Sequence, residues 1–125
     1  MSHEHYRTAI EACNAAAEAS GHCAVACLFE PNRMELARCI QLDMDCAEIC
    51  RLTAAYMARG SELVGEICGF AADACDLCAE ECEQHPMAHC RRCAKACREC
   101  AQECRAIAGG RKRPTATQTG KPATH

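Results

Sequence analysis

Cysteine recurs along this chain at steps of three and four residues, the spacing that places side chains on one face of an α-helix. The run of Cys90, Cys93, Cys97, Cys100 and Cys104 alternates these steps, which is the a/d seam of a heptad repeat. Three earlier segments also carry all of their cysteines on one seam each. Because such seams face inward when helices pack together, the thiols are expected to line the core of a helical bundle.

Four helical segments are separated by short breaks of helix-terminating residues. The breaks fall at Glu30-Pro31-Asn32, Gly60-Ser61, His85-Pro86 and Gly109-Gly110. Asn32 is predicted to cap the second helix, with Glu35 completing a capping box. Ser61 is predicted to cap the third helix, and Pro86 is predicted in the first turn of the fourth. Helices are therefore expected over residues 3–29, 33–59, 62–84 and 86–108.

These segments predict an all-α fold, an antiparallel up-down-up-down four-helix bundle with a cysteine-lined core, because short loops make successive helices antiparallel neighbours. The bundle is expected over residues 1–108, and the Gly-, Pro-, Thr- and Lys-rich residues 109–125 are expected to form a disordered tail. The 125 residues include 15 cysteines, two Tyr, two Phe and no Trp. Alanine and cysteine must therefore supply most of the interior.

Antiparallel packing groups the facing seam residues into layers across the bundle. Five layers contain all the thiols, and in order they are Cys27, Cys39, Cys82 and Cys90; Cys23, Asp43, Cys78 and Cys93; Ser20, Cys46, Cys75 and Cys97; Ala16, Cys50, Ala71 and Cys100; and Cys13, Thr53, Cys68 and Cys104. A sixth layer without thiols is expected to close one end, and it consists of Ala9, Met57, Val64 and Ala108. The sequence thus predicts a tube of sulfur along most of the bundle.

The number of thiols indicates metal binding rather than packing or disulfides. The polar N-terminus, residues 1–7, has no apolar signal segment, which predicts a cytoplasmic protein whose thiols stay reduced. Disulfides would have to form against that reducing environment. A core of cysteine and alanine that served only as apolar filling would pack poorly compared with leucine or valine.

Charge separates the candidate metals. A Cu(I) ion that replaces one thiol proton leaves the net charge unchanged, whereas Zn²⁺ held by four thiolates carries a net charge of about −2 that is costly to bury. Soft thiolates favour Cu(I). Two sulfurs lie on one helical face in each of the pairs Cys23/Cys27, Cys46/Cys50, Cys78/Cys82, Cys93/Cys97 and Cys100/Cys104. All fifteen cysteines are therefore candidate ligands for multiple Cu(I) ions. An Fe–S electron-transfer protein and a metallothionein-like Zn²⁺ buffer stay open as alternatives.

A four-helix bundle with seam cysteines in repeated Cys-x-x-x-Cys pairs resembles the bacterial copper storage proteins, in particular their cytosolic members. The resemblance covers nearly all of the predicted bundle. It implies Cu(I)–thiolate clusters in the core, a homotetramer, and a role in storing copper or limiting its toxicity. The cysteines carry over as ligands, but Asp43, Ser20 and Thr53 occupy seam positions where the pattern of sites is broken.

The all-cysteine layer is expected at the end of the bundle that carries the breaks near residues 30–32 and 84–87. His85 is one seam step beyond Cys82 and is expected to be a metal ligand there. Met87 and His89 are expected near this entrance, although His89 is predicted to point off the seam. The remaining histidines are expected to face solvent, and they are His3, His5, His22 and His125.

Several other function classes are disfavoured. The net charge of −3 and the short basic run at residues 111–113 do not predict nucleic-acid binding. No segment approaches the ~20 apolar residues that a membrane-spanning helix needs. The thiols lack a paired base except near His85, so an enzyme is not expected. A second apolar stripe on the third helix predicts a subunit interface, and it consists of Ile67, Phe70, Ala74 and Leu77.

Overall fold

Four long helices make up the protein, which we describe from a computed structural model of residues 3–109. They are α1 (Arg7–Leu28), α2 (Ala37–Ala58), α3 (Val64–Cys82) and α4 (Ala88–Ile107). Single 3₁₀ turns precede two of them, η1 (His3–Tyr6) before α1 and η2 (Arg33–Leu36) before α2. The predicted all-α four-helix fold is confirmed.

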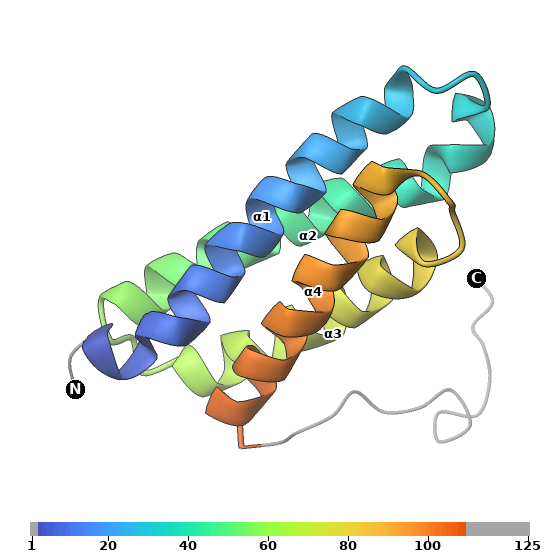
Figure 1. Ribbon diagram of the computed structural model, residues 1–125. Helices are drawn as coiled ribbons and strands as arrows, with labels where there is room; N and C mark the ends of the chain where they lie inside the picture. Colours follow the sequence, from blue (N-terminus) through green and yellow to red (C-terminus); the bar gives the residue numbers. More distant parts are fainter. Residues whose placement is uncertain (1–2, 110–125) are drawn as a thin grey trace, which may run out of the picture.

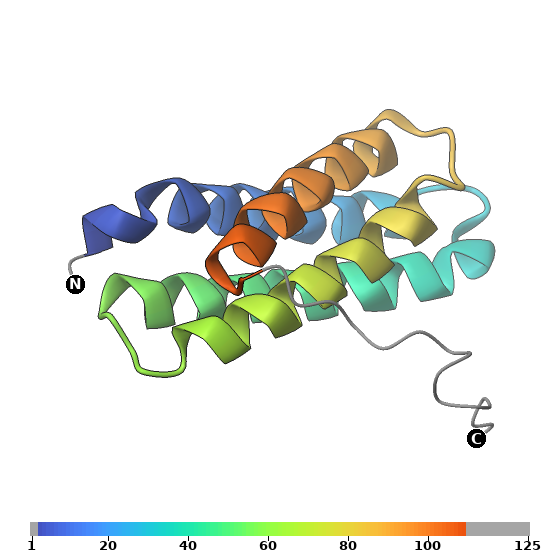
Figure 2. The ribbon, with the colours of Figure 1, turned by 90° about the horizontal axis from the view of Figure 1, so that it is seen from below.

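The helices alternate in direction, so that the connections gather at two ends of the bundle. Figure 1 shows the α1–α2 and α3–α4 connections at one end and the α2–α3 connection at the other. Each helix packs against two others, α1 and α3 each lying between α2 and α4. The view in Figure 2 shows the same up-down-up-down arrangement from below. We call the end that carries the α1–α2 and α3–α4 connections the mouth.

The end of α2 follows the prediction that Gly60 stops the helix. Gly60 has a φ of 66°, in the left-handed region that a residue without Cβ enters at little cost. The Gly60 amide donates to the carbonyl of Met57 over 3.1 Å, and the Ser61 amide donates to the carbonyl of Tyr56 over 3.0 Å. This pair of bonds is a Schellman motif, which satisfies carbonyls that the helix itself leaves without a partner.

The helix starts differ from the predicted ones by a few residues. Asn32 makes no side-chain capping bond, and η2 separates it from α2, so the predicted capping box is wrong. Ser61 does accept the Leu63 amide over 3.0 Å, but α3 begins later, at Val64. Pro86 precedes α4 rather than lying in its first turn, because the extended Met87 (φ −66°, ψ 146°) is the N-cap.

The core holds few large side chains. Alanines flank the cysteine seams on all four helices and are buried, which lets the backbones approach closely. Met57 is fully buried in the closing layer with Ala9 and Val64, while Ala108 is only partly buried. Leu36, which the sequence did not single out, is fully buried at the mouth. None of the helices in residues 3–109 is both long and apolar enough to span a bilayer.

Two sequence-based expectations concern the chain ends and the outer histidines. The predicted tail lies outside the described residues from position 110 onward, as does His125, and the side chain of His3 is not described either. His5 and His22 are exposed to solvent as expected.

Candidate metal centre

All fifteen cysteines point into the bundle. Each is a free thiol, and each has a relative exposure of 0%. The helical repeat accounts for this, because steps of three and four residues keep a side chain within one stripe of the helix surface. The described core therefore contains a continuous internal surface of sulfur contributed by all four helices.

The sulfur contacts reproduce the predicted layers. In the first layer the Cys39 and Cys82 sulfurs lie 3.7 Å apart. In the third, the sulfur of Cys46 lies 3.6 Å from those of both Cys75 and Cys97. Contacts in the second, fourth and fifth layers are Cys78–Cys93 at 3.8 Å, Cys50–Cys100 at 3.9 Å and Cys13–Cys104 at 3.5 Å. The antiparallel register inferred from the spacing is confirmed.

Sulfurs four residues apart also lie close together along α1, α2 and α4. The Sγ–Sγ distance is 3.9 Å for Cys23–Cys27 and Cys46–Cys50, and 3.8 Å for Cys100–Cys104. Metal–sulfur bonds of ~2.3 Å reach two such sulfurs after a small side-chain rotation. The layers are thereby joined along the bundle axis, and one thiol can belong to more than one group.

Several groups of donors lie within 4.8 Å of one another, close enough to hold a metal ion together. The all-cysteine groups include Cys23, Cys27, Cys39 and Cys90; Cys13, Cys50 and Cys100; and Cys46, Cys50 and Cys75. Two further groups contain Asp43 with three cysteines each. Because the donors are almost all sulfur, the surface suits a soft metal ion.

Asp43 is the one buried carboxylate in the second layer. Cys78, Cys93 and Cys82 donate to its Oδ1 atom over 3.1, 3.3 and 3.5 Å, and Cys39 donates to its Oδ2 atom over 3.8 Å. Burial raises the pKa of Asp43 to about 8, and the nearby Cys93 acts in the same direction. The carboxyl group is therefore largely neutral in the metal-free core near pH 7.

Two hydroxyl groups interrupt the thiol lining in different ways. The Ser20 hydroxyl lies 3.4 Å from the Cys93 sulfur and 3.5 Å from the Cys97 sulfur. The Thr53 hydroxyl instead donates over 2.7 Å to the carbonyl of Ile49, four positions earlier in the same helix. Ser20 thus belongs to the sulfur surface, whereas the hydroxyl hydrogen of Thr53 is committed to the backbone.

The mouth places the two histidines differently from the prediction. His89 lies with its Nδ1 atom 3.3 Å from the Cys23 sulfur, 3.6 Å from that of Cys90 and 4.0 Å from that of Cys27. The expectation that His89 points off the seam is wrong for its ring, because in the first turn of α4 the side chain of this neighbour of Cys90 brings Nδ1 to three thiols. Met87 itself is partly buried and packs against the core.

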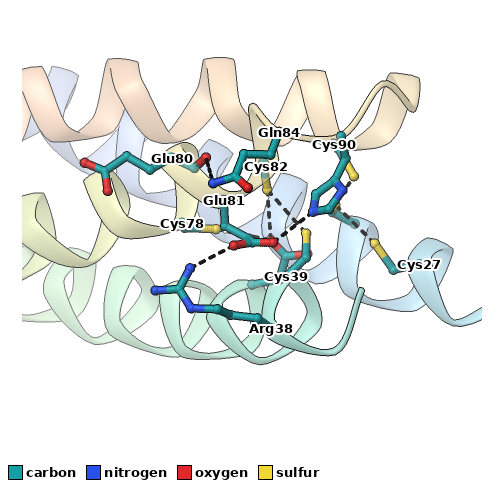
Figure 3. A network of polar contacts seen from close by, with 12 residues as sticks. Cys27, Arg38, Cys39, Cys78, Glu80, Glu81, Cys82, Gln84 and Cys90 are labelled. Carbon is teal, nitrogen blue, oxygen red and sulfur yellow. Dashed lines mark hydrogen bonds and ion pairs between the residues drawn. The ribbon is translucent and has the colours of Figure 1, made fainter. Parts of the chain in front are cut away.

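His85, which the seam pattern favoured, makes its hydrogen bond to a carboxylate instead. Its Nε2 atom lies 2.8 Å from Oε2 of Glu81, whose other oxygen accepts from Arg38 over 2.8 Å. Glu81 is buried, with 8% relative exposure. Figure 3 shows Arg38 reaching Glu81 beside the sulfur atoms of Cys39 and Cys82. The step from Cys82 to His85 leads to the end of α3, where the chain leaves the seam.

Sequence reasoning missed the carboxylates of the mouth. Glu81 lies four residues before His85, so helical spacing alone could have paired them. Glu30 accepts a hydrogen bond from His89 over 2.9 Å, but the two residues are 59 positions apart and no local pattern joins them.

Two thiols at the mouth, Cys27 and Cys90, are protonated in the metal-free protein. Burial raises the pKa of Cys90 to about 11 and also raises the pKa of Cys27. Among the residues that the structure describes, the buried side chains include no Lys or Arg. A cation bound here would thus be balanced by the thiolates that it creates, one released proton for each positive charge.

Comparisons with known proteins agree with this arrangement. The family described as "Copper storage protein" matches residues 2–109. A structure described as the Cu(I)-bound copper storage protein BsCsp3 is 43% identical, with a TM-score of 0.79 over 82% of this chain and 96% of its own. A cytosolic copper storage protein from Streptomyces lividans, described with five coppers, is 38% identical, with a TM-score of 0.82 over 86% of this chain and 95% of its own. The cysteine-rich protein YhjQ of Bacillus subtilis, described as uncharacterized, is 44% identical over 70% of this chain and 81% of its own.

Proposed function

The chain belongs to the copper storage protein family, and we propose that it binds and stores many Cu(I) ions through its core thiolates. The observation that carries the proposal is the single internal surface of fifteen buried, free thiols. We place this storage in the cytosol, as for the Streptomyces lividans relative described as cytosolic. Storage needs no catalysis, and the proposal includes none.

Charge balance supports Cu(I) over Zn²⁺ as the stored ion. Each Cu(I) can replace one thiol proton, so a filled core stays close to neutral in a region of low dielectric constant. Several Zn²⁺ ions with four thiolates each would leave several negative charges buried without cations. The same argument disfavours a row of anionic Fe–S clusters. Two solved relatives are described with bound copper, one of them with ten copper equivalents.

The proposed ligands are the cysteines named above, with His89 added at the mouth because its Nδ1 atom already faces three thiols. His85 is a weaker candidate than the sequence suggested, because among the hydrogen bonds of residues 3–109 its ring bonds to Glu81, whereas the imidazole that bonds to thiols is that of His89. Met87 lies partly buried beside this end, and its thioether is a further soft donor.

The proposal extends to a homotetramer, the assembly that the family resemblance implies. A groove between α2 and α3 supports an interface, because apolar side chains dominate its lining: Leu42, Ile49, Phe70, Ala74 and Leu77. It contains most of the stripe predicted on α3. Phe70 is 57% exposed and adds an aromatic side chain to this groove.

An anaerobic titration tests the function. The reduced protein is titrated with Cu(I) in the presence of a chromophoric Cu(I) chelator, and circular dichroism follows the helix content. We expect about one Cu(I) per cysteine, or slightly more, without loss of helix. Binding of only one or two ions per chain contradicts storage. Parallel reconstitutions with Zn²⁺, and with iron and sulfide, test the two alternative metal sites.

A further inference from the structure

Two histidine–carboxylate pairs lie at the mouth and differ in what the imidazole faces. His89 bonds through Nε2 to Oε2 of Glu30 over 2.9 Å, and His85 bonds through Nε2 to Oε2 of Glu81 over 2.8 Å. The bonds are alike in atoms and in length. The His85–Glu81 pair can therefore serve as a control for the His89–Glu30 pair, because only the ring of His89 is hydrogen-bonded to thiols among the described residues.

The bond to Glu30 determines which nitrogen of His89 is available. A carboxylate only accepts hydrogen bonds, so the Nε2 atom must carry a proton while this bond is formed. In the neutral imidazole the lone pair then lies on Nδ1. That atom is the one 3.3 Å from the Cys23 sulfur and 3.6 Å from the Cys90 sulfur. The tautomer thus presents a nitrogen donor toward the first thiols of the core.

Glu30 is well placed to hold this arrangement. Its amide donates to the Cys27 carbonyl over 3.1 Å at the end of α1, which ties its backbone to the helix that carries two of the mouth thiols. The side chains of His89 and Glu30 have relative exposures of 12% and 27%. Partial burial protects the bond from competing water, so it orients the ring more firmly than an exposed pair would.

Glu81 has a different set of neighbours. Its second oxygen accepts from Arg38 over 2.8 Å, so the carboxylate is shared between a cation and His85. The Nε2 atom of His85 is directed at this pair. Glu81 therefore joins α3 to Arg38 of α2 at the mouth. The same carboxylate holds the ring of His85.

We propose that Glu30 is a positioning residue that fixes His89 in the Nε2–H tautomer, so that His89 receives Cu(I) at the mouth and hands it to Cys23, Cys27 and Cys90. Each transfer moves the ion from nitrogen to sulfur and releases the thiol proton, with no change in oxidation state. This role rests on the proposed storage of Cu(I). The hydrogen bond from His89 to Glu30 is of the kind by which carboxylates outside a metal site orient metal-bound histidines in other proteins.

The tautomer is tested first, in the metal-free protein. Long-range proton–nitrogen NMR correlations of the ¹⁵N-labelled, reduced chain distinguish Nδ1–H from Nε2–H histidine. We expect His89 in the Nε2–H form in the natural sequence, a mixture in Glu30→Ala, and the Nε2–H form again in Glu30→Gln, whose amide oxygen still accepts. Glu81→Ala should leave His89 unchanged. A proton on Nδ1 in the natural sequence, or an unchanged tautomer in Glu30→Ala, overturns the proposal.

Loading kinetics supply the second test. Stopped-flow mixing with a chromophoric Cu(I)–chelator complex follows the first equivalents of copper. We expect Glu30→Ala and His89→Ala each to slow this phase about tenfold, the lower end of the effect of removing an outer partner of a metal-bound histidine. The double variant should be no slower than His89→Ala. The final capacity should be the same in Glu30→Ala and the natural sequence.

Other results of these two experiments separate the role of Glu30 from the storage of Cu(I). Multiplying effects in the double variant, or equal slowing by Glu81→Ala, overturn the role of Glu30. Normal copper capacity with an unchanged rate in Glu30→Ala overturns this role alone and leaves storage intact, whereas no Cu(I) binding by the natural sequence overturns both. If Glu30→Ala loses helix content, Glu30→Leu repeats both measurements with a side chain of similar length that cannot accept a hydrogen bond.

Discussion

The Cys78 thiol donates a hydrogen bond to Oδ1 of Asp43 over 3.1 Å, within a layer where three of the four seam positions are cysteine. A carboxyl group that is buried among thiols is stable mainly in its neutral form, because burial disfavours the charged one. The metal-free core is therefore sensitive to pH at this position.

We expect the stability of the metal-free protein to fall as pH rises from about 4 to about 8. Burial raises the pKa of Asp43 to about 8 in the folded chain, so the folded state binds more protons than the unfolded state across this window. The free energy of unfolding then decreases with pH by at most about 1.4 kcal/mol per pH unit from this group. Urea unfolding of the reduced protein at several pH values measures the slope.

The matched variant for this prediction is Asp43→Asn, which keeps the shape and removes the titration. Its unfolding free energy should vary less with pH over the same range. Equal slopes in the two proteins would show that Asp43 ionises in the folded core as readily as in the unfolded chain.

Copper loading should release about one proton per Cu(I). The mouth thiol Cys90 is protonated before binding, since burial raises its pKa to about 11, and a thiol must lose its proton to become a ligand. A weakly buffered titration with a pH indicator, under anaerobic conditions, counts the protons. Release of clearly fewer protons than bound ions would mean that the core is already populated by thiolates.

Ser20→Cys should add capacity to the third layer. The Ser20 hydroxyl already lies 3.4 and 3.5 Å from two sulfurs, so exchanging oxygen for sulfur extends the lining with little change in volume. We expect about one additional Cu(I) per chain, because each thiol can exchange its proton for one such ion. The chelator titration described above measures it. Ser20→Ala, as the control, should keep the natural capacity, and equal capacities in both variants would contradict the prediction.

Phe70→Glu should weaken the assembly. The side chain lies over the apolar groove between α2 and α3, and a charge buried there without a partner costs several kcal/mol. Light scattering after size-exclusion chromatography should show a smaller species, with helix content retained. Leu63→Glu, at an exposed apolar residue outside the groove, serves as the control. A tetramer that persists in Phe70→Glu would place the interface elsewhere.

Much of the core was predictable because it depends on one simple regularity. A heptad-like spacing determines which face of a helix a residue occupies, and short connections determine that neighbouring helices are antiparallel. The spacing alone therefore assigns Cys46 and Cys75 to one layer and Cys50 and Cys100 to the next. In the folded chain the sulfurs of these two pairs lie 3.6 and 3.9 Å apart.

The helix ends were less predictable, because their conformation depends on more than periodicity. The pattern favoured Asn32 as a cap and Pro86 inside α4, but a 3₁₀ turn and an extended Met87 occupy these places. Residues left outside the helix, such as Pro86, no longer follow the 3.6-residue repeat, so the periodicity does not give the direction of their side chains.

The sequence by itself determined that the cysteines share one internal surface, that its lining is broken at Asp43 and Ser20, and that the fold is a helical bundle. Only the tertiary structure decided that the ring of His89 faces the thiols and that Glu30 holds this ring. The physical reason is that periodicity acts within one helix, whereas the bond between His89 and Glu30 joins side chains 59 residues apart that meet only when α1 and α4 pack together.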